Sequence, residues 1–275
     1  MPELPADLPA QVEAALREDV GSGDVTAALV PVAQQVRGAV ITRENAVLCG
    51  AAWADETFRR LDERVRLTWH ARDGAALTAG QAVFDISGPA RPVLTGERTA
   101  LNFLQLLSAT ATAARAFATA VAGTGCTVLD TRKTLPGLRT AQKYAVRCGG
   151  GDNYRMGLYD RVLIKENHIA AARRTAPGIT VEVEVETLAE FAEALDAKPD
   201  VVMLDEFSHA DMRTAVAHNQ ARGRPLKIEA SGSVSLENVR AVAETGVDYV
   251  SVGSLTKHVR AVDLSMRLQF TEVKS

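Results

Sequence analysis

The stretch that decides the fold is residues 129–169, LDTRKTLPGLRTAQKYAVRCGGGDNYRMGLYDRVLIKENHI. Two short apolar runs, at 126–130 and 161–165, lie at its start and near its end, and basic residues stand where each run ends. A charge at the end of a buried strand points to a site, whereas a charge in the middle of a helix is usually solvated. The basic residues of the stretch are Arg132, Lys133, Arg139, Lys143, Arg147, Arg155, Arg161 and Lys165, against Asp152 and Asp160. This local excess of positive charge predicts a pocket for a small polyanion.

The composition narrows the classes to which the chain can belong. Its 275 residues suit one large domain or two ordinary ones, and 31 basic against 34 acidic residues give a net charge of -3. That balance argues against non-specific binding to nucleic acid. The first residues lack the basic start and apolar run of a signal peptide, and no apolar run reaches the ~20 residues of a membrane helix. We therefore expect a cytoplasmic protein with neither nucleic-acid nor membrane partners.

Cysteine and histidine give no metal-binding pattern. Cys49, Cys126 and Cys148 form no CxxC pair and are odd in number, which suits packing thiols in a reducing compartment. The five histidines show no ligand spacing, so a site built from histidine is not expected.

The N-terminal part predicts a small α/β sandwich. Helical periodicity covers residues 8–20 and about 51–62, and strand-like pieces cover 36–50, 65–70 and 81–88. The longest helical pattern, 97–122, ends at Gly123-Thr124-Gly125, a favourable place for a domain change. We expect residues 1–110 to form the sandwich and 111–275 a second domain with the active site, with the C-terminal tail packing back on the first.

The second part alternates between strand and helix. Apolar, β-rich runs lie at 126–130, 161–165, 180–185, 200–204, 226–230 and 247–252, and helical stretches lie at 188–197, 208–222 and 235–245. This alternation predicts parallel strands with right-handed crossovers. The link at 169–179 is short and contains Pro177-Gly178, so a full helix is not expected there.

Charged or small residues follow each of the six runs. In order they are Thr131-Arg132-Lys133, Lys165-Glu166-Asn167-His168, Glu184 and Glu186, Asp205, Glu229-Ser231-Gly232, and Ser251-Gly253-Ser254. In a closed α/β barrel such ends converge on one face, whereas in a flat doubly wound sheet only the switch point forms a crevice. The pattern favours an α/β fold in which an N-terminal sandwich precedes an incomplete, about six-stranded parallel barrel.

Three groups of residues suggest what the site would bind. Arg132, Lys133, Arg155 and Lys165 suit carboxylates or phosphates, unless they are ordinary surface cations. Glu182, Glu184 and Glu186 alternate with valines, so they share one strand face. In a barrel these glutamates would turn inward to hold ribose hydroxyls or a divalent metal. On an exposed sheet they would form the solvent-facing side. Ser231-Gly232-Ser233 and Gly253-Ser254 would let backbone N–H groups approach a phosphate, although such turns favour Gly and Ser in any case.

Seven segments carry a resemblance to a known family. They are DTRKT, GGGDNYR, GLYDRVLIKENHI, VEVEVE, MLDEF, EASGSV and VGSLT, in that order, and similarity extends from GDVT through ERTALNFLQLLS to VRAVDLSMR. The chain resembles the quinolinate phosphoribosyltransferases over nearly its whole length. The resemblance implies transfer of a phosphoribosyl group from phosphoribosyl pyrophosphate to quinolinate with decarboxylation, giving nicotinate mononucleotide, CO₂ and pyrophosphate for NAD biosynthesis. It also implies a homodimer in which one subunit's N-terminal domain covers the other's barrel mouth.

The same resemblance implies roles for individual residues. Arg132, Arg155 and Lys165 would bind the carboxylates of quinolinate, with Tyr154 beside them and Arg98 reaching the pocket from the partner subunit. Lys133, Glu184 and Asp205 would contact the sugar donor, with Lys165 also catalytic, and the two carboxylates would face ribose hydroxyls or Mg²⁺. Thr131, Ser231, Gly232, Ser233, Val252, Gly253 and Ser254 would complete the substrate site, most of them around the 5′-phosphate. Tyr154 departs from the family, in which a histidine normally precedes the substrate arginine.

Three rival interpretations remain open from the residues. A Schiff-base aldolase could use Lys165 at a strand end. A paralogous phosphoribosyltransferase could act on another anionic base. A non-catalytic barrel could bind a phosphorylated metabolite without releasing pyrophosphate.

Overall fold

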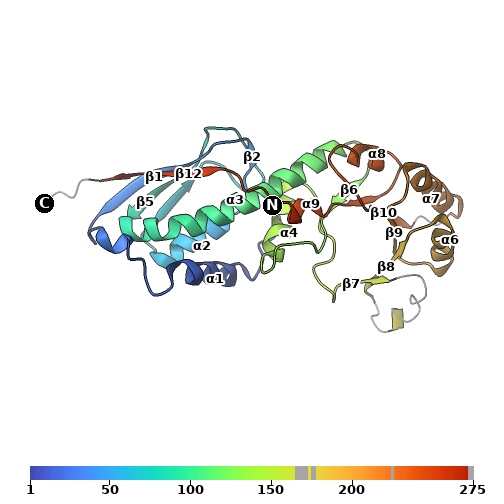
Figure 1. Cartoon of the computed structure of the whole chain (residues 1–275), viewed down its shortest axis with the longest axis horizontal. Coiled ribbons are helices and arrows are strands. Elements are labelled where there is room, and N and C mark those ends of the chain that lie inside the picture. Colours follow the sequence, from blue (N-terminus) through green and yellow to red (C-terminus); the bar gives the residue numbers. More distant parts are fainter. Residues whose placement is uncertain (165–172, 175–177, 224–225, 272–275) are drawn as a thin grey trace. The chain divides into compact units, whose positions relative to one another are not determined.

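The computed structural model describes residues 1–164, 173–174, 178–223 and 226–271. Lys165 and most of the link at 169–179 therefore lie outside the described residues. The chain forms two compact units: Met1–Ala113, Pro136–Gly150 and His258–Ser275 make the first, and Ala114–Leu135 with Gly151–Lys257 make the second. Figure 1 labels their elements. No helix of the described segments is long and apolar enough to cross a membrane.

A four-stranded antiparallel sheet and a layer of helices build the first unit. The sheet has the order β12-β1-β5-β3, and a separate two-stranded sheet pairs β2 with β4. The strands are β1 (Gln35–Thr42), β2 (Ala46–Val47), β3 (Arg66–Trp69), β4 (Ala76–Leu77), β5 (Ala82–Pro89) and β12 (Leu264–Phe270); the helices are α1 (Leu8–Val20), η1 (Ala27–Leu29), α2 (Ala51–Leu61), α3 (Ala90–Ala120) and α4 (Arg139–Gly149). The C-terminal strand β12 is antiparallel to β1 along its length, from Val36 opposite Phe270 to Thr42 opposite Leu264.

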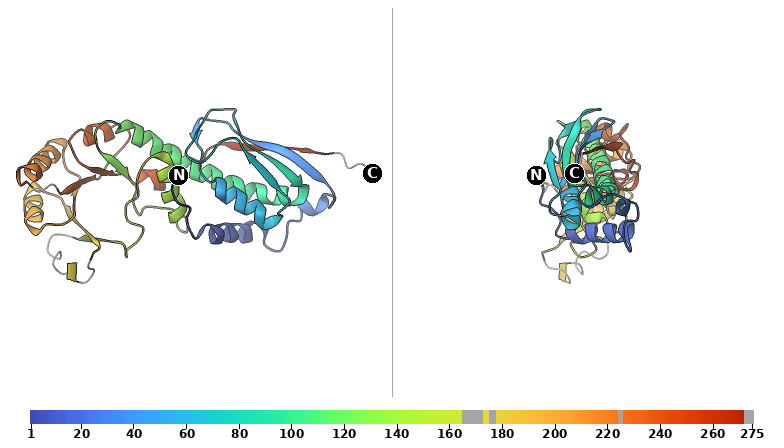
Figure 2. Two further views of the ribbon diagram at one scale, coloured as in Figure 1. Left: turned by 180° about the vertical axis from the view of Figure 1, so that it is seen from behind. Right: turned by 90° about the vertical axis from the view of Figure 1, so that its left-hand side faces the viewer.

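The first unit has two apolar cores. One lies between the sheet and the helices and includes Phe84, Ile86 and Leu104, all at most 2% exposed. The other surrounds Trp53, which contacts Phe103 and Tyr144 with ring centroids 6.5 and 5.5 Å apart and donates its indole N–H to Gln11. Figure 2 shows α2 and α3 against the antiparallel sheet.

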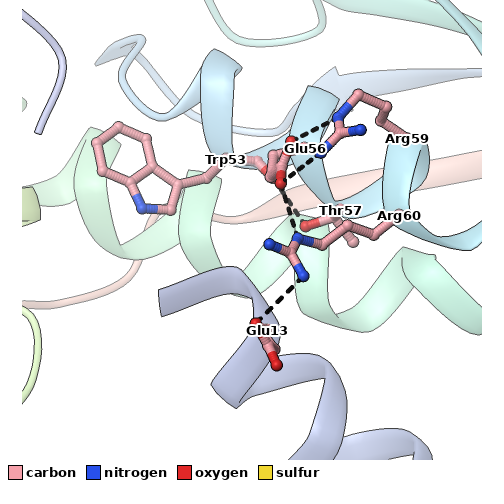
Figure 3. Close-up of polar contacts among 6 residues, drawn as sticks. All are labelled: Glu13, Trp53, Glu56, Thr57, Arg59 and Arg60. Atoms are coloured by element: carbon pink, nitrogen blue, oxygen red, sulfur yellow. Dashed lines mark hydrogen bonds and ion pairs between the residues drawn. The ribbon is translucent and has the colours of Figure 1, made fainter. Parts of the chain in front are cut away.

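The outer surface of α2 carries ion pairs. Glu56 accepts from Arg59 and Arg60, each at 2.7 Å, and Arg60 also reaches Glu13 of α1 at 3.4 Å (Figure 3). Such exposed pairs contribute about 0–1 kcal/mol each, so the Trp53 core provides most of the stability of this helix pair.

A six-stranded parallel sheet forms the second unit. Its order is β6-β11-β10-β9-β8-β7. The strands are β6 (Thr127–Leu129), β7 (Arg161–Ile164), β8 (Thr180–Val185), β9 (Val201–Asp205), β10 (Lys227–Ser231) and β11 (Tyr249–Ser251); the helices are α6 (Leu188–Ala197), α7 (His209–Ala221), α8 (Val239–Ala243) and α9 (Ser254–Lys257). Strand β6, the first of this sheet along the chain, pairs with β11, the last. Strands β6 and β7 are the two edge strands. The predicted α/β fold with an incomplete six-stranded parallel barrel is confirmed.

Local sequence signals set the helix starts of this unit. Thr187 and Glu190 form a capping box at α6, and Ser208 caps α7 by accepting the N–H of Asp211. The valines of β8 are buried and α6 packs on that strand, so the helices cover the outer face.

Two helices differ from the expected pattern. The helix expected at 97–122 begins seven residues earlier, and α4 was not expected as a helix. Because α4 belongs to the first unit, three basic residues of the deciding stretch, Arg139, Lys143 and Arg147, lie outside the barrel unit.

Candidate active site

Lys133 is held where β6 and β11 end. Its N–H donates to Thr131 Oγ1 at 3.1 Å, and its carbonyl accepts the Thr256 hydroxyl at 2.9 Å. A methyl group added to Gly253 would lie 3.0 Å from the Lys133 Cδ, so the lysine stem packs directly over this glycine. The side chain remains exposed, which leaves the ammonium available to an anion.

Glu184 and Asp205 end neighbouring strands. On β8 the glutamates alternate with valines that are at most 1% exposed, so Glu184 shares the face of Glu182. Glu184 lies opposite Met203 of β9, which belongs to the barrel's interior apolar cluster with Leu129 and Tyr154. The expectation that these glutamates turn inward is confirmed for Glu182 and Glu184, whereas Glu186 lies beyond the end of β8 and is exposed.

The turn after β10 contacts the turn after β9. Ser231 pairs with Asp205, and the Ser231 carbonyl accepts the N–H of Glu206 at 3.0 Å. The Ser233 hydroxyl donates to Glu206 Oε1 at 2.9 Å. Both Glu206 and Ser233 have positive φ, 54° and 47°, a conformation that non-glycine residues adopt mainly where the surroundings enforce it.

Gly232 leaves room for this turn contact. Its φ is 95°, and a Cβ there would lie 2.5 Å from the Glu206 carboxyl carbon. The glycine therefore permits both the backbone conformation and the close approach of the Glu206 side chain.

Tyr154 lies in the barrel interior. Its N–H donates to Asp130 at 2.8 Å, and its hydroxyl donates to Glu182 Oε2 at 2.5 Å. Burial, followed by the charge of Glu182, raises the pKa of Tyr154, so the phenol stays protonated. Arg155 follows directly, with its guanidinium carbon 5.7 Å from the centre of the Tyr154 ring.

The described geometry brings together some predicted residues and leaves others apart. Thr131, Lys133 and Gly253 meet at one end of the sheet, and Asp205, Ser231, Gly232 and Ser233 meet beside it. Val252 is buried and donates its N–H to the Leu129 carbonyl, so it fixes the strand rather than facing the opening, and Ser254 is the first residue of α9. Arg98 is exposed on α3 in the first unit, and Lys165 is outside the described residues.

The site also contains two residues that sequence reasoning did not single out, Asp130 and Glu206. Glu182, Glu229 and Ser251 were expected at this face, but their hydrogen bonds to Tyr154 and to each other's strands were not. A usable signal existed for Glu229, because a carboxylate in the middle of the apolar run LKIEA has to be either paired or protonated when the strand is buried.

The residues present fit the expected Mg²⁺. Glu184 and Asp205 supply half-buried carboxylate oxygens on neighbouring strands, and oxygen donors with room for substrate phosphates are what Mg²⁺ prefers.

Cys49, Asp73 and Cys148 form another group of potential ligands, in the first unit, with their ligand atoms within 4.8 Å of one another. The hydrogen bonds of this second group give it a structural role. Asp73 accepts the N–H of Ala51 at the start of α2 and the hydroxyl of Tyr144, and all three residues are buried. Cys126 is buried as well, and burial raises the pKa of its thiol to about 12. Cys126 thus packs as a neutral thiol, and Cys49 and Cys148 hydrogen-bond to each other inside the first unit.

An incomplete parallel α/β barrel with a cation, two carboxylates and two glycine turns at its strand ends defines a class of enzyme that binds a phosphorylated, polyanionic substrate. The chain belongs to the quinolinate phosphoribosyl transferase family: residues 24–108 match the family's N-terminal domain and residues 110–267 its C-terminal domain.

Relatives and solved structures agree with this assignment. The chain is 41% identical over 273 residues to the nicotinate-nucleotide pyrophosphorylase [carboxylating] of Mycobacterium leprae, covering 94% of this chain and 95% of that protein. It is 40% identical over 260 residues to a probable enzyme of the same name from Bacillus subtilis, and the match covers 90% of this chain and 89% of that protein. The solved nicotinate-nucleotide pyrophosphorylase of Francisella tularensis matches with a TM-score of 0.91 at 43% identity, covering 97% of this chain and 98% of that one.

Proposed function

We propose that this chain transfers the phosphoribosyl group of phosphoribosyl pyrophosphate to quinolinate and releases CO₂ and pyrophosphate with nicotinate mononucleotide. The family assignment supports the reaction class. The packing of Lys133 over Gly253 is the single observation on this chain's own residues that most supports the proposal. It places a cation beside a turn whose backbone can approach a phosphate.

The proposed chemistry suits the charges at the strand ends. The quinolinate ring nitrogen attacks C1 of the sugar as pyrophosphate leaves, and positive charge develops on the ribose. Fixed carboxylates at Glu184 and Asp205 favour that charge, and Lys133 favours the departing pyrophosphate. The ribosylated ring is then cationic, so as CO₂ departs the electron pair of the broken C–C bond stays on the ring carbon beside the charged nitrogen, and a proton from solvent takes the place of CO₂ on that carbon.

Other residues would bind and orient. Arg132 and Arg155 suit the two carboxylates of quinolinate, because guanidinium groups match carboxylates in two parallel hydrogen bonds. Lys165 would join them from the end of β7. Glu184 and Asp205 would hold Mg²⁺, which when bound neutralises charge on the pyrophosphate.

We further propose a homodimer in which Arg98 of one subunit completes the pocket of the other. The exposed position of Arg98 on α3 supports this arrangement, because among the described residues of its own unit the side chain is left accessible to a partner.

One assay tests the reaction. Purified protein is incubated with quinolinate, phosphoribosyl pyrophosphate and Mg²⁺, and nicotinate mononucleotide is measured. We expect nucleotide formation that depends on all three additions. Turnover of a different anionic base, or binding without pyrophosphate release, would instead favour a paralogous transferase or a non-catalytic barrel. A borohydride-trapped adduct on Lys165 would favour an aldolase.

A further inference from the structure

The Glu206 side chain lies against the turn that follows β10. The two segments are neighbours because β9 and β10 are adjacent in the sheet. Glu206 Oε1 accepts the Ser233 hydroxyl at 2.9 Å, and a Cβ added to Gly232 would lie 2.5 Å from the Glu206 carboxyl carbon and 2.7 Å from Oε1. The carboxylate therefore covers the open side of the glycine and binds the serine hydroxyl at the same time.

These two features are the ones that would let the turn bind a phosphate. A glycine allows an anion to approach the backbone closely, and a serine hydroxyl can donate a hydrogen bond to it. Within the described part of the chain, the backbone N–H groups of Gly232 and Ser233 donate to no protein acceptor. Backbone N–H groups in turns are common ligands of phosphate. An anionic side chain thus already lies in a turn that is suited to an anion.

Other contacts hold the turn in shape. The Asn238 side chain donates to the Ser233 carbonyl at 3.0 Å and accepts the N–H of Ser235 at 2.9 Å. The Glu206 backbone N–H donates to the Ser231 carbonyl at 3.0 Å. The Glu206 carboxylate is therefore not required to form the turn. Its side chain is exposed, so it can move into solvent while the backbone stays in place.

We propose that the Glu206 carboxylate is an internal competitor for the phosphate turn, defined here as Ser231, Gly232 and Ser233. It occupies the turn when the site is empty, and the phosphate of a phosphorylated sugar displaces it. The inference rests on the proposed function in one respect, that this turn receives the 5′-phosphate of the sugar donor. Glu206 acts through the turn and touches no reacting atom, so it is a positioning residue.

The charge of Glu206 explains why the two anions exclude each other. A phosphate and a carboxylate a few Å apart repel, and the repulsion weakens once solvent separates them. Part of the binding free energy of each phosphorylated ligand is therefore spent on displacing Glu206. A ligand without a phosphate does not meet this cost, because it leaves the carboxylate in place.

Glu206→Gln tests the competition by kinetics. The substitution removes the charge and keeps the size and the hydrogen-bond acceptor. We expect the KM for the sugar donor to fall about three- to tenfold, with the KM for quinolinate changed less than about twofold. Glu237→Gln is the matched control, because Glu237 is an exposed glutamate shortly after the turn, and it should leave both constants unchanged.

The direction of the change decides between competition and its alternatives. A residue that only stabilised the turn would not lower the KM when it is replaced. A carboxylate that bound the donor or its Mg²⁺ would raise the KM on replacement. An unchanged or raised KM for the sugar donor in Glu206→Gln would therefore overturn the proposal.

A binding measurement does not depend on turnover. In isothermal titration calorimetry, we expect ribose 5-phosphate to bind Glu206→Gln about three- to tenfold more tightly than the wild type or Glu237→Gln. If the affinity rises but quinolinate is not turned over, the proposed reaction is wrong and the competition stands. Equal affinities, or no binding by either protein, would contradict the competition whatever the reaction.

Crystal structures of the wild type would show the displacement itself. Without ligand, we expect the Glu206 carboxylate to contact Ser233, as it does here. With ribose 5-phosphate bound, we expect the carboxylate to have left the turn. A phosphate bound in the turn beside an unmoved Glu206 would contradict the proposal.

Discussion

Gly253 shows how a single position constrains the stem of Lys133. A Cβ at this residue would lie 3.0 Å from Lys133 Cδ and 3.5 Å from Thr131 Oγ1. The glycine φ is not positive, so an alanine would cause crowding without backbone strain.

We expect Gly253→Ala to displace the Lys133 stem and raise the KM for the sugar donor several-fold while the protein stays folded. Steady-state kinetics with the donor varied would measure this. The control is the double variant with Lys133→Met: if crowding of Lys133 is the cause, the two changes will not be additive. Full additivity would assign the effect to another contact.

Glu229 makes stability depend on pH in an uncommon direction for a carboxyl group. Its folded-state pKa is raised, mainly by burial, so the folded protein binds more protons than the unfolded chain above the unfolded pKa of about 4.3. The stabilisation is fully present below that unfolded pKa and is lost as the pH rises through the folded-state pKa. Glu229→Gln should reduce this decline, as measured by urea unfolding between pH ~5 and ~9. Parallel curves for the two proteins would contradict the assignment.

At the residue scale, the sequence showed which charged groups stand at strand ends but not their partners. The alternation VEVEVE was sufficient to place Glu182 and Glu184 on one face. The hydrogen bond from Ser251 to Glu229 could not be predicted, because it depends on how β10 and β11 pair in the folded sheet. The contact of Ser233 with Glu206 depends in the same way on two turns distant in sequence.

At the element scale, the strands were the most predictable feature and two helices the least. The early start of α3 was hidden because Pro92 and Gly96 suggest a break, yet proline is tolerated in a first helical turn. A Cβ on Gly96 would lie 2.8 Å from Leu61 and Phe58 side-chain atoms, so this glycine permits α2 and α3 to pack closely. The pattern for α4 was present as Ala141, Tyr144, Ala145 and Cys148, at helical spacing, but the basic residues of this stretch were interpreted as part of an anion pocket.

The pairing of β1 with β12 can be tested at one glycine. An added Cβ at Gly38 would fall on the Arg267 carbonyl oxygen and within 2.6 Å of Leu268. We expect Gly38→Ala to separate the strands locally and to increase amide hydrogen exchange in residues 264–270. Arg37→Ala, at the exposed neighbouring position, should leave exchange there unchanged. Unaltered protection in Gly38→Ala would show that the strand can shift without losing its pairing.

At the scale of the whole molecule, the family's two domains match residues 24–108 and 110–267, whereas the two compact units alternate along the chain. The fold class followed from the alternation of strand and helix together with the charged residues at the strand ends. The contribution of residues 136–150 to the first unit was not apparent from the sequence, because domain membership depends on packing rather than on position in the chain.

The proposed dimer gives a test by complementation. Arg98→Ala and Arg132→Ala should each be nearly inactive, because each leaves a substrate carboxylate without its cation. If Arg98 acts in the partner's pocket, mixing the two variants after subunit exchange should restore about one quarter of wild-type activity, since half of the dimers are mixed and each has one intact site. Activity that stays at the level of the single variants, despite mixed dimers shown by mass spectrometry, would place Arg98 in its own subunit's site or outside the site.

The stoichiometry of the reaction tests the central proposal most directly. Labelled CO₂, pyrophosphate and nicotinate mononucleotide can be measured together in a single time course with quinolinate and the sugar donor. If Lys133, Glu184 and Asp205 converge on one quinolinate-specific site, as we propose, the three products appear in equal amounts and none forms with Arg132→Ala. Pyrophosphate release without CO₂, or undiminished turnover by a folded Arg132→Ala protein, would contradict it.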